Sequence, residues 1–120
     1  MKILIADDEV EATEVLVKYL KKRAAVVDSV ADGEDALRLI KKQEYDLIIS
    51  DINMPGLTGL EILRYVKDNH LKAKVVLLTG YPCVDSNLAK TLRADEYLEK
   101  PTALEAIGKI VEKYTPSDQG

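Results

Sequence analysis

The fold is decided by the stretch Leu47-Ile48-Ile49-Ser50-Asp51-Ile52-Asn53-Met54-Pro55-Gly56. The apolar or small residues at 47–50 are typical of a strand that is buried on both faces, and Pro55-Gly56 prevents its continuation. Asp51 is therefore expected to emerge where this strand ends. In open α/β sheets ligands bind beyond the carboxyl ends of the strands, so the residues that end the other strands decide whether Asp51 belongs to a site.

Four further strands are predicted, and three of them also end in a reactive side chain. They cover residues 2–6, 25–30, 74–78 and 96–99. Asp7-Asp8 follows the first of these strands, Thr79 follows the strand at 74–78, and Lys100 follows the last. Parallel strands bring their carboxyl ends to one edge of a sheet, so these side chains are expected to share a crevice with Asp51.

Apolar residues recur at helical spacing after each strand. The core-facing residues of four predicted helices are Ala12, Val15, Leu16, Tyr19 and Leu20; Ala36, Leu37 and Ile40; Ile62, Leu63 and Val66; and Ala103, Ile107, Ile110, Val111 and Tyr114. Another helix is predicted at residues 84–92. Side-chain caps are expected at Asp32, Thr58 and Thr102, each of which stands three residues before an acidic residue.

This alternation predicts an α/β fold with a doubly wound, five-stranded parallel sheet. The strands at 2–6, 47–50 and 74–78 are continuously apolar and belong in the middle, while the more polar strands at 25–30 and 96–99 belong at the edges. With right-handed crossovers, the strands, numbered in chain order, are predicted to lie in the sheet in the order 2-1-3-4-5. The first and last helices are expected on one face and the other three on the opposite face.

Composition narrows the class of protein. The 17 basic and 21 acidic residues give a net charge of -4, which argues against direct nucleic-acid binding and favours protein partners. Cys83 is the only cysteine, so no internal disulfide can form, and we interpret it as a small apolar residue in a reducing compartment. The lone His70 is expected in a solvated loop. No apolar run approaches the ~20 residues of a membrane helix, so we expect a soluble, cytoplasmic protein without membrane contact.

The residues of the predicted crevice have a joint chemistry. Asp7, Asp8 and Asp51 would repel one another unless a cation joined them, and their hard oxygen ligands suit Mg²⁺. A metal beside Lys100 makes a site for phosphoryl oxygens, and a carboxylate there can act as a nucleophile and form an aspartyl phosphate. Each acid alone is more simply a helix cap or a solvated turn residue. Their coincidence with Thr79 and Lys100 at four strand ends favours the site.

These motifs together resemble the receiver domain of the bacterial response-regulator family, over essentially the whole chain. The residues that carry the resemblance are Asp7-Asp8, Asp51-Ile-Asn-Met-Pro-Gly-Leu-Thr-Gly59, Thr79-Gly80 and Tyr97-Leu-Glu-Lys100-Pro101. The resemblance implies a flavodoxin-like (βα)5 fold and a regulatory switch of a two-component system, which catalyses its own phosphorylation and dephosphorylation but is not otherwise an enzyme. Arg93 stands where the family usually has glycine, so the helix at 84–92 is expected to be short or irregular.

The resemblance also implies a role for each acid. Asp51 would be the phosphoacceptor, and the donor would be the phosphohistidine of a sensor histidine kinase or of a phosphotransfer protein. Asp8 and Asp51 would bind Mg²⁺ directly, and Asp7 would act mainly through water. The backbone carbonyl of Asn53 would complete the protein ligands.

By the same resemblance, Lys100 would pair with one phosphoryl oxygen and Thr79 would donate a hydrogen bond to another, while Tyr97 would be the switch aromatic. Phosphorylation adds a charge of about -1.5 to -2 at neutral pH, which would draw Thr79 inward. Tyr97 could fill the space left beside it and so change the surface formed by residues 84–114. That surface would control an output domain or partner protein, and it allows a phosphorylation-dependent homodimer.

Two other classes of protein share parts of this pattern. A small Mg²⁺-dependent phosphohydrolase of the haloacid-dehalogenase type also uses an aspartate nucleophile, but it generally places a second aspartate where this chain has Asn53. A flavodoxin-like cofactor carrier would need a phosphate-binding loop after the first strand, and that position holds Asp7-Asp8-Glu9. We expect residues 1–115 to form the receiver domain and residues 116–120 to be a tail or a truncated linker.

Overall fold

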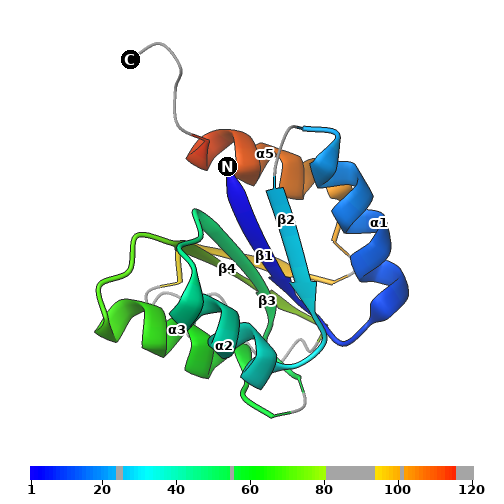
Figure 1. The fold of residues 1–120 in the computed structure, drawn as a ribbon. Helices are drawn as coiled ribbons and strands as arrows, with labels where there is room; N and C mark the ends of the chain where they lie inside the picture. The colour runs from blue at the N-terminus through cyan, green and yellow to red at the C-terminus, as the bar shows by residue number, and fades with distance from the viewer. Residues whose placement is uncertain (24–25, 55, 81–93, 101, 116–120) are drawn as a thin grey trace, which may run out of the picture.

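The chain forms a five-stranded parallel sheet with helices on both faces (Figure 1). The structure, a computed structural model, describes residues 1–23, 26–54, 56–80, 94–100 and 102–115. The strands are β1 (Lys2–Ala6), β2 (Val26–Val30), β3 (Leu47–Asp51), β4 (Lys74–Thr79) and β5 (Glu96–Glu99). Their order, β2-β1-β3-β4-β5, confirms the predicted topology.

The described helices divide between the two faces as predicted (Figure 1). On one face lie α1 (Val10–Lys21) and α5 (Leu104–Tyr114), and on the other lie α2 (Gly33–Lys42) and α3 (Gly59–Asp68). The helix predicted at residues 84–92, with Cys83 and Arg93, lies outside the described residues. Within the described part, no helix combines the length and the apolar character needed to cross a membrane.

A separate apolar core fills the space on each face of the sheet. Successive side chains of a strand point to opposite faces, so in β1 Leu4 packs against α2 and α3, whereas Ile3 and Ile5 pack against α1 and α5. Residues 47–51 of β3 are buried throughout, which explains the unbroken apolar run in the sequence. In the edge strand β2, Val26 is exposed.

The predicted core face was wrong in part for α1 and also at Ala103, which is exposed. Ala12 and Val15 were expected on the core face of α1, but both are exposed, and Thr13, Leu16 and Leu20 are buried instead. Positions 13, 16 and 20 follow the three- and four-residue spacing of one helical face, and the hydroxyl of Thr13 avoids a buried unpaired donor by donating to the carbonyl of Glu9.

The predicted helix caps gave a mixed outcome. Asp32 accepts a hydrogen bond from the backbone N–H of Asp35 at 2.8 Å, and Thr58 accepts one from Glu61, so both caps are confirmed. Thr102 was expected to cap the last helix, but α5 begins two residues later and its N-cap is Ala103. The hydroxyl of Thr102 donates instead to the carbonyl of Glu99, the last residue of β5, at 3.1 Å.

Candidate functional site

The predicted crevice lies where the strands end. Asp51 is the last residue of β3 and Thr79 the last residue of β4, while Asp7 directly follows β1 and Lys100 directly follows β5. Carboxylate oxygens of Asp7, Asp8 and Asp51 all lie within 4.8 Å of one another. Asp7 and Asp51 are buried and Asp8 is exposed, so the cluster is open to solvent on one side.

Lys100 joins the acids of the crevice. Its Nζ atom lies 2.9 Å from Oδ2 of Asp7 and 3.0 Å from Oδ2 of Asp51. It also lies 2.9 Å from Oε1 of Glu9, which comes from the turn before α1. The backbone N–H of Lys100 donates to the carbonyl of Thr79 at 2.6 Å, which fixes where the lysine leaves the sheet.

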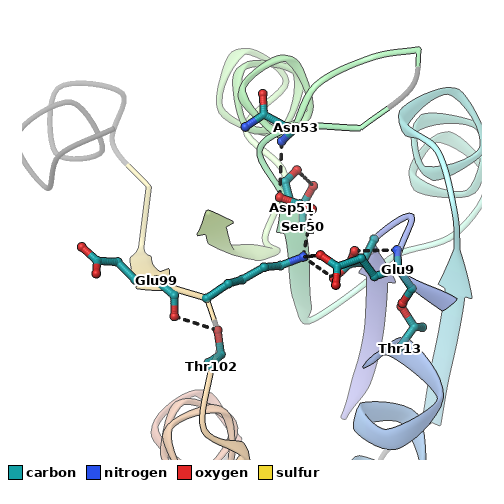
Figure 2. Close-up of polar contacts among 9 residues, drawn as sticks. Glu9, Thr13, Ser50, Asp51, Asn53, Glu99 and Thr102 are labelled. Carbon is teal, nitrogen blue, oxygen red and sulfur yellow. Dashed lines mark hydrogen bonds and ion pairs between the residues drawn. The ribbon is translucent and has the colours of Figure 1, made fainter. Parts of the chain in front are cut away.

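Asp51 is held by its own loop and by the start of α3. Its Oδ1 atom accepts a hydrogen bond from the backbone N–H of Asn53 at 3.3 Å, and its carbonyl accepts one from the hydroxyl of Ser50 at 3.0 Å (Figure 2). Gly59 packs directly on this backbone, because a Cβ atom there would lie 2.4 Å from the Asp51 carbonyl oxygen. A residue without a side chain is therefore required at position 59 to keep Asp51 in place.

The crevice contains more negative than positive side chains. Burial raises the pKa of Asp51 above its usual range, and the charge of Asp7 adds to this, although the hydrogen bond and charge of Lys100 act in the opposite direction. Burial alone would lower the pKa of Lys100, but its hydrogen bonds to Glu9, Asp7 and Asp51 outweigh burial and raise it. One ammonium thus faces an excess of carboxylates, which favours binding of a further cation.

The three aspartates fit the requirements of Mg²⁺. This ion prefers oxygen ligands at about 2.0–2.1 Å and usually keeps several waters. Carboxylate oxygens of the three aspartates lie within 4.8 Å of one another, close enough to surround one ion. The exposure of Asp8 leaves room for water on the same side.

Thr79 and Tyr97 lie near one another on the same face of the sheet. Tyr97 pairs with Leu77 in the register of β4 and β5, and Thr79 follows Leu77 by two residues. Side chains two apart in a strand share a face, so Tyr97 and Thr79 are diagonal neighbours on the face that α2 and α3 cover. Thr79 is buried, whereas Tyr97 is half-buried and packs against the core of that face.

The residues predicted from the sequence to share the crevice do not include Glu9. They are Asp7, Asp8, Asp51, Thr79 and Lys100. Of the acidic run at residues 7–9, only Asp7 and Asp8 are expected in the crevice from the sequence. Glu9 reaches Lys100 across 91 residues of chain, and no local pattern records that contact. The available signal was its place at the end of the first strand, one residue before α1 begins.

A cavity of about 420 Å³ lies beside the crevice, between α1 and the start of α5. Glu9 and Lys100 line its charged side, and Leu16, Leu78 and Ile107 line its apolar side. Gly80 also borders it.

Comparison with known proteins gives a consistent result. A family model described as the response regulator receiver domain matches residues 3–112. The regulatory protein VanR of Enterococcus faecium is 39% identical over 111 residues, which cover 91% of this chain and 48% of VanR. The transcriptional regulatory protein TctD of Salmonella typhimurium is 37% identical over 108 residues, with 89% and 48% covered. The chain therefore spans about half the length of these relatives.

Solved structures agree with these relatives. The response regulator protein TrrA from Thermotoga maritima, in complex with Mg²⁺-BeF, has a TM-score of 0.84 and 35% identity, covering 95% of this chain and 98% of that one. The chemotaxis response regulator CheY4 of Vibrio cholerae has a TM-score of 0.82 and 28% identity, with 95% and 98% covered. The phosphohydrolase alternative finds no support in these comparisons.

Proposed function

Because the chain belongs to the response regulator receiver family of two-component systems, we propose that its Asp51 carboxylate accepts a phosphoryl group and holds it as a signal. One observation carries this proposal. The ammonium of Lys100 lies 3.0 Å from Oδ2 of Asp51, beside carboxylate oxygens of Asp7 and Asp8. A nucleophile, a cation for the phosphoryl oxygens and a set of metal ligands thus meet at one point.

The transfer uses Asp51 as the nucleophile. An oxygen of Asp51 forms a bond to phosphorus while the bond from phosphorus to the donor nitrogen of a phosphohistidine breaks, and that nitrogen keeps the electron pair. The ammonium of Lys100 can donate to a phosphoryl oxygen that gains charge during the transfer. The domain would in this way catalyse its own phosphorylation. Attack by water on the same phosphorus would break the bond from phosphorus to the Asp51 oxygen, release inorganic phosphate and restore the carboxylate.

Mg²⁺ would neutralise charge on the transferring group. We assign its direct protein ligands to Asp8, to Asp51 and to the backbone carbonyl of Asn53. Both oxygens of Asp7 are already engaged, since Oδ1 accepts from the backbone N–H of Glu9 at 2.9 Å and Oδ2 accepts from Lys100. The oxygens of Asp51 are engaged in the same way, by Asn53 and Lys100. We therefore assign Asp7 a role through water from the family resemblance and not from its hydrogen bonds.

The switch is assigned to Thr79 and Tyr97. A phosphoryl group on Asp51 offers new charged acceptors at the end of β3, and β4, which ends in Thr79, is its direct neighbour in the sheet. A shift of the Thr79 hydroxyl toward that group would open space next to its diagonal neighbour Tyr97. Movement of Tyr97 would then change the surface around β5 and α5, which is the part of the predicted output surface that the structure describes.

The partners follow from this assignment. A sensor histidine kinase or a phosphotransfer protein would supply the phosphoryl group, and an output domain or partner protein, or a second copy of the chain, would recognise the changed surface. We assign residues 1–115 to the receiver domain and residues 116–120 to a tail or linker. The relatives VanR and TctD are regulatory proteins about twice as long, which is consistent with control of an output domain.

The proposal is tested by exposing the protein to Mg²⁺ and a small phosphoramidate donor and measuring its intact mass. The wild-type chain should gain one phosphoryl group, and Asp51→Asn should gain none. Asp68→Asn, which removes an exposed carboxylate at the end of α3, is the matched control and should behave as wild type. Uptake by Asp51→Asn, or no uptake by the wild type, would refute the assignment.

A further inference from the structure

We propose that Glu9 is a positioning residue that holds the ammonium of Lys100 before phosphorylation and releases it to the phosphoryl group. This inference rests on the proposed function of Asp51. Its basis is the ion pair between Nζ of Lys100 and Oε1 of Glu9, which at 2.9 Å is as short as the contact of Lys100 with Asp7. Glu9 lies outside the group of three carboxylates that can hold a metal.

The hydrogen-bonding capacity of Lys100 is fully used in this state. A lysine ammonium has three N–H donors, and Lys100 reaches the three carboxylates of Asp7, Glu9 and Asp51 at 2.9, 2.9 and 3.0 Å. A phosphoryl group on Asp51 adds oxygen acceptors next to the same ammonium. Lys100 can donate to one of them only if an existing bond is given up or turned toward it.

Glu9 is the partner that can leave at the lowest cost. Its side chain is 62% exposed, whereas those of Asp7 and Asp51 are 6% and 9% exposed. Water can replace Lys100 around an exposed carboxylate, but a buried carboxylate that loses its cation stays desolvated. The bond to Glu9 should therefore break while the bond to Asp7 stays.

Only the side chain of Glu9 needs to move. Its backbone N–H donates to Oδ1 of Asp7 at 2.9 Å. Its carbonyl accepts from the backbone N–H and the hydroxyl of Thr13, both at 3.0 Å, and Figure 2 shows Glu9 and Thr13 side by side. Glu9 stands at the N-cap position of α1, yet among the described residues its side chain makes no capping bond to that helix. The carboxylate is thus directed at Lys100 from a fixed point.

This arrangement makes Glu9 a competitor of the phosphoryl group. Its negative charge holds Lys100 in the unphosphorylated state, and the phosphoryl group competes with it for the same ammonium. Removing the charge while keeping the shape, as in Glu9→Gln, should favour the phosphorylated state. Glu11→Gln is the matched control, because Glu11 is an exposed acid in the first turn of the same helix and is not a partner of Lys100.

The test is a titration of the protein with beryllofluoride, a phosphoryl mimic, at saturating Mg²⁺, followed by amide NMR. Glu9→Gln should bind it about two- to fivefold more tightly than Glu11→Gln, which is the effect of one exposed ion pair. In a Lys100→Met background, Glu9→Gln and Glu11→Gln should change the affinity for beryllofluoride equally. Without beryllofluoride, the Cε resonance of Lys100 should differ between wild type and Glu9→Gln. With beryllofluoride bound, the resonances of the two proteins should coincide.

Other results would overturn the proposal. Equal or weaker binding by Glu9→Gln than by Glu11→Gln would show that Glu9 does not compete for Lys100. A gain that persists in the Lys100→Met background would show that Glu9 acts by charge alone. If the wild type itself binds no beryllofluoride and takes up no phosphate, the assignment of Asp51 fails as well, and this outcome differs from the first two because it is seen without any variant.

Discussion

The ammonium of Lys100 lies 3.0 Å from Oδ2 of Asp51, although 49 residues separate the two in the chain and β4 lies between their strands. The contact links the end of β3 to the end of β5 directly over the crevice. A phosphoryl group on Asp51 must therefore change the surroundings of Lys100, and with them the end of β5 that carries Tyr97.

Lys100→Ala should separate metal binding from switching. Asp7, Asp8 and Asp51 remain in this variant, so Mg²⁺ should still bind, but a phosphoryl group on Asp51 loses the partner that ties it to β5. The expected result is the loss of the amide shifts near Tyr97 that beryllofluoride causes in the wild type. Lys74→Ala, which removes an exposed lysine at the start of β4, serves as the control. Unchanged shifts near Tyr97 in Lys100→Ala would contradict the account.

Asp51→Asn should stabilise the fold at neutral pH when no Mg²⁺ is added. The pKa of Asp51 is raised on folding, so the folded state favours the protonated carboxyl. The stability that this group contributes is complete below the unfolded pKa of about 3.9 and is lost as the pH rises through the folded pKa. At pH 7 the charged Asp51 therefore destabilises the fold, and the amide removes this effect.

Thermal unfolding measures this difference. Asp51→Asn should raise Tm at pH 7, and each 1 kcal/mol gained would appear as roughly 2–8 °C in a domain near this size. The difference in Tm between Asp51→Asn and wild type should shrink toward zero near pH 3. Saturating Mg²⁺ should reverse it, because the ion stabilises the wild type, which binds it more tightly. A lower Tm than wild type at pH 7 without Mg²⁺ would show that the pair with Lys100 outweighs burial.

Asp8→Asn should weaken Mg²⁺ binding without unfolding the domain. Asp8 is exposed, so its amide can be hydrated, but the proposed metal site loses one of its charged ligands. The dissociation constant from calorimetric titration should rise at least about tenfold, because changes in outer-shell partners alone cost ~10–100-fold in affinity. Asp68→Asn should leave it unchanged. An unaltered affinity in Asp8→Asn would remove Asp8 from the ligand set.

Gly59→Ala and Gly80→Ala form a matched pair at the crevice. A Cβ atom at Gly59 would lie 2.4 Å from the backbone oxygen of Asp51, whereas at Gly80 its closest neighbour is Cβ of Lys100 at 3.9 Å. Gly59→Ala should destabilise the domain by about 1–3 kcal/mol, the usual range for overpacking. Gly80→Ala should unfold like wild type in urea. Equal stability of the two variants would show that α3 does not fix the Asp51 backbone.

Much of the fold was predictable because its signals are local. Each of β1, β3 and β4 is a continuous apolar run, and the more polar β2 lies at the edge, so burial alone orders the strands. The same property located Asp51, Thr79 and Lys100, since each stands at or next to the end of a strand. The caps at Asp32 and Thr58 were predictable from three-residue spacing.

The remaining features depend on contacts that the local sequence does not record. The predicted core face of α1 was wrong because the polar residue Thr13 is buried while the apolar residue Val15 is exposed. Polarity alone predicts the opposite for both residues. The expected cap at Thr102 failed because its hydroxyl bonds to the carbonyl of Glu99. The role of Glu9 depends on Lys100 reaching back from the far edge of the sheet.

Mapping the acyl phosphate tests whether Asp51, and no other acid of the crevice, accepts the phosphoryl group. Borohydride delivers one hydride to the acyl carbon, which expels phosphate and leaves an aldehyde, and a second hydride and a proton convert that aldehyde to homoserine. After phosphorylation with Mg²⁺ and a small phosphodonor, peptide sequencing should find homoserine at position 51 alone. Homoserine at Asp7 or Asp8, or at no position in a chain that has gained phosphate, would contradict the account.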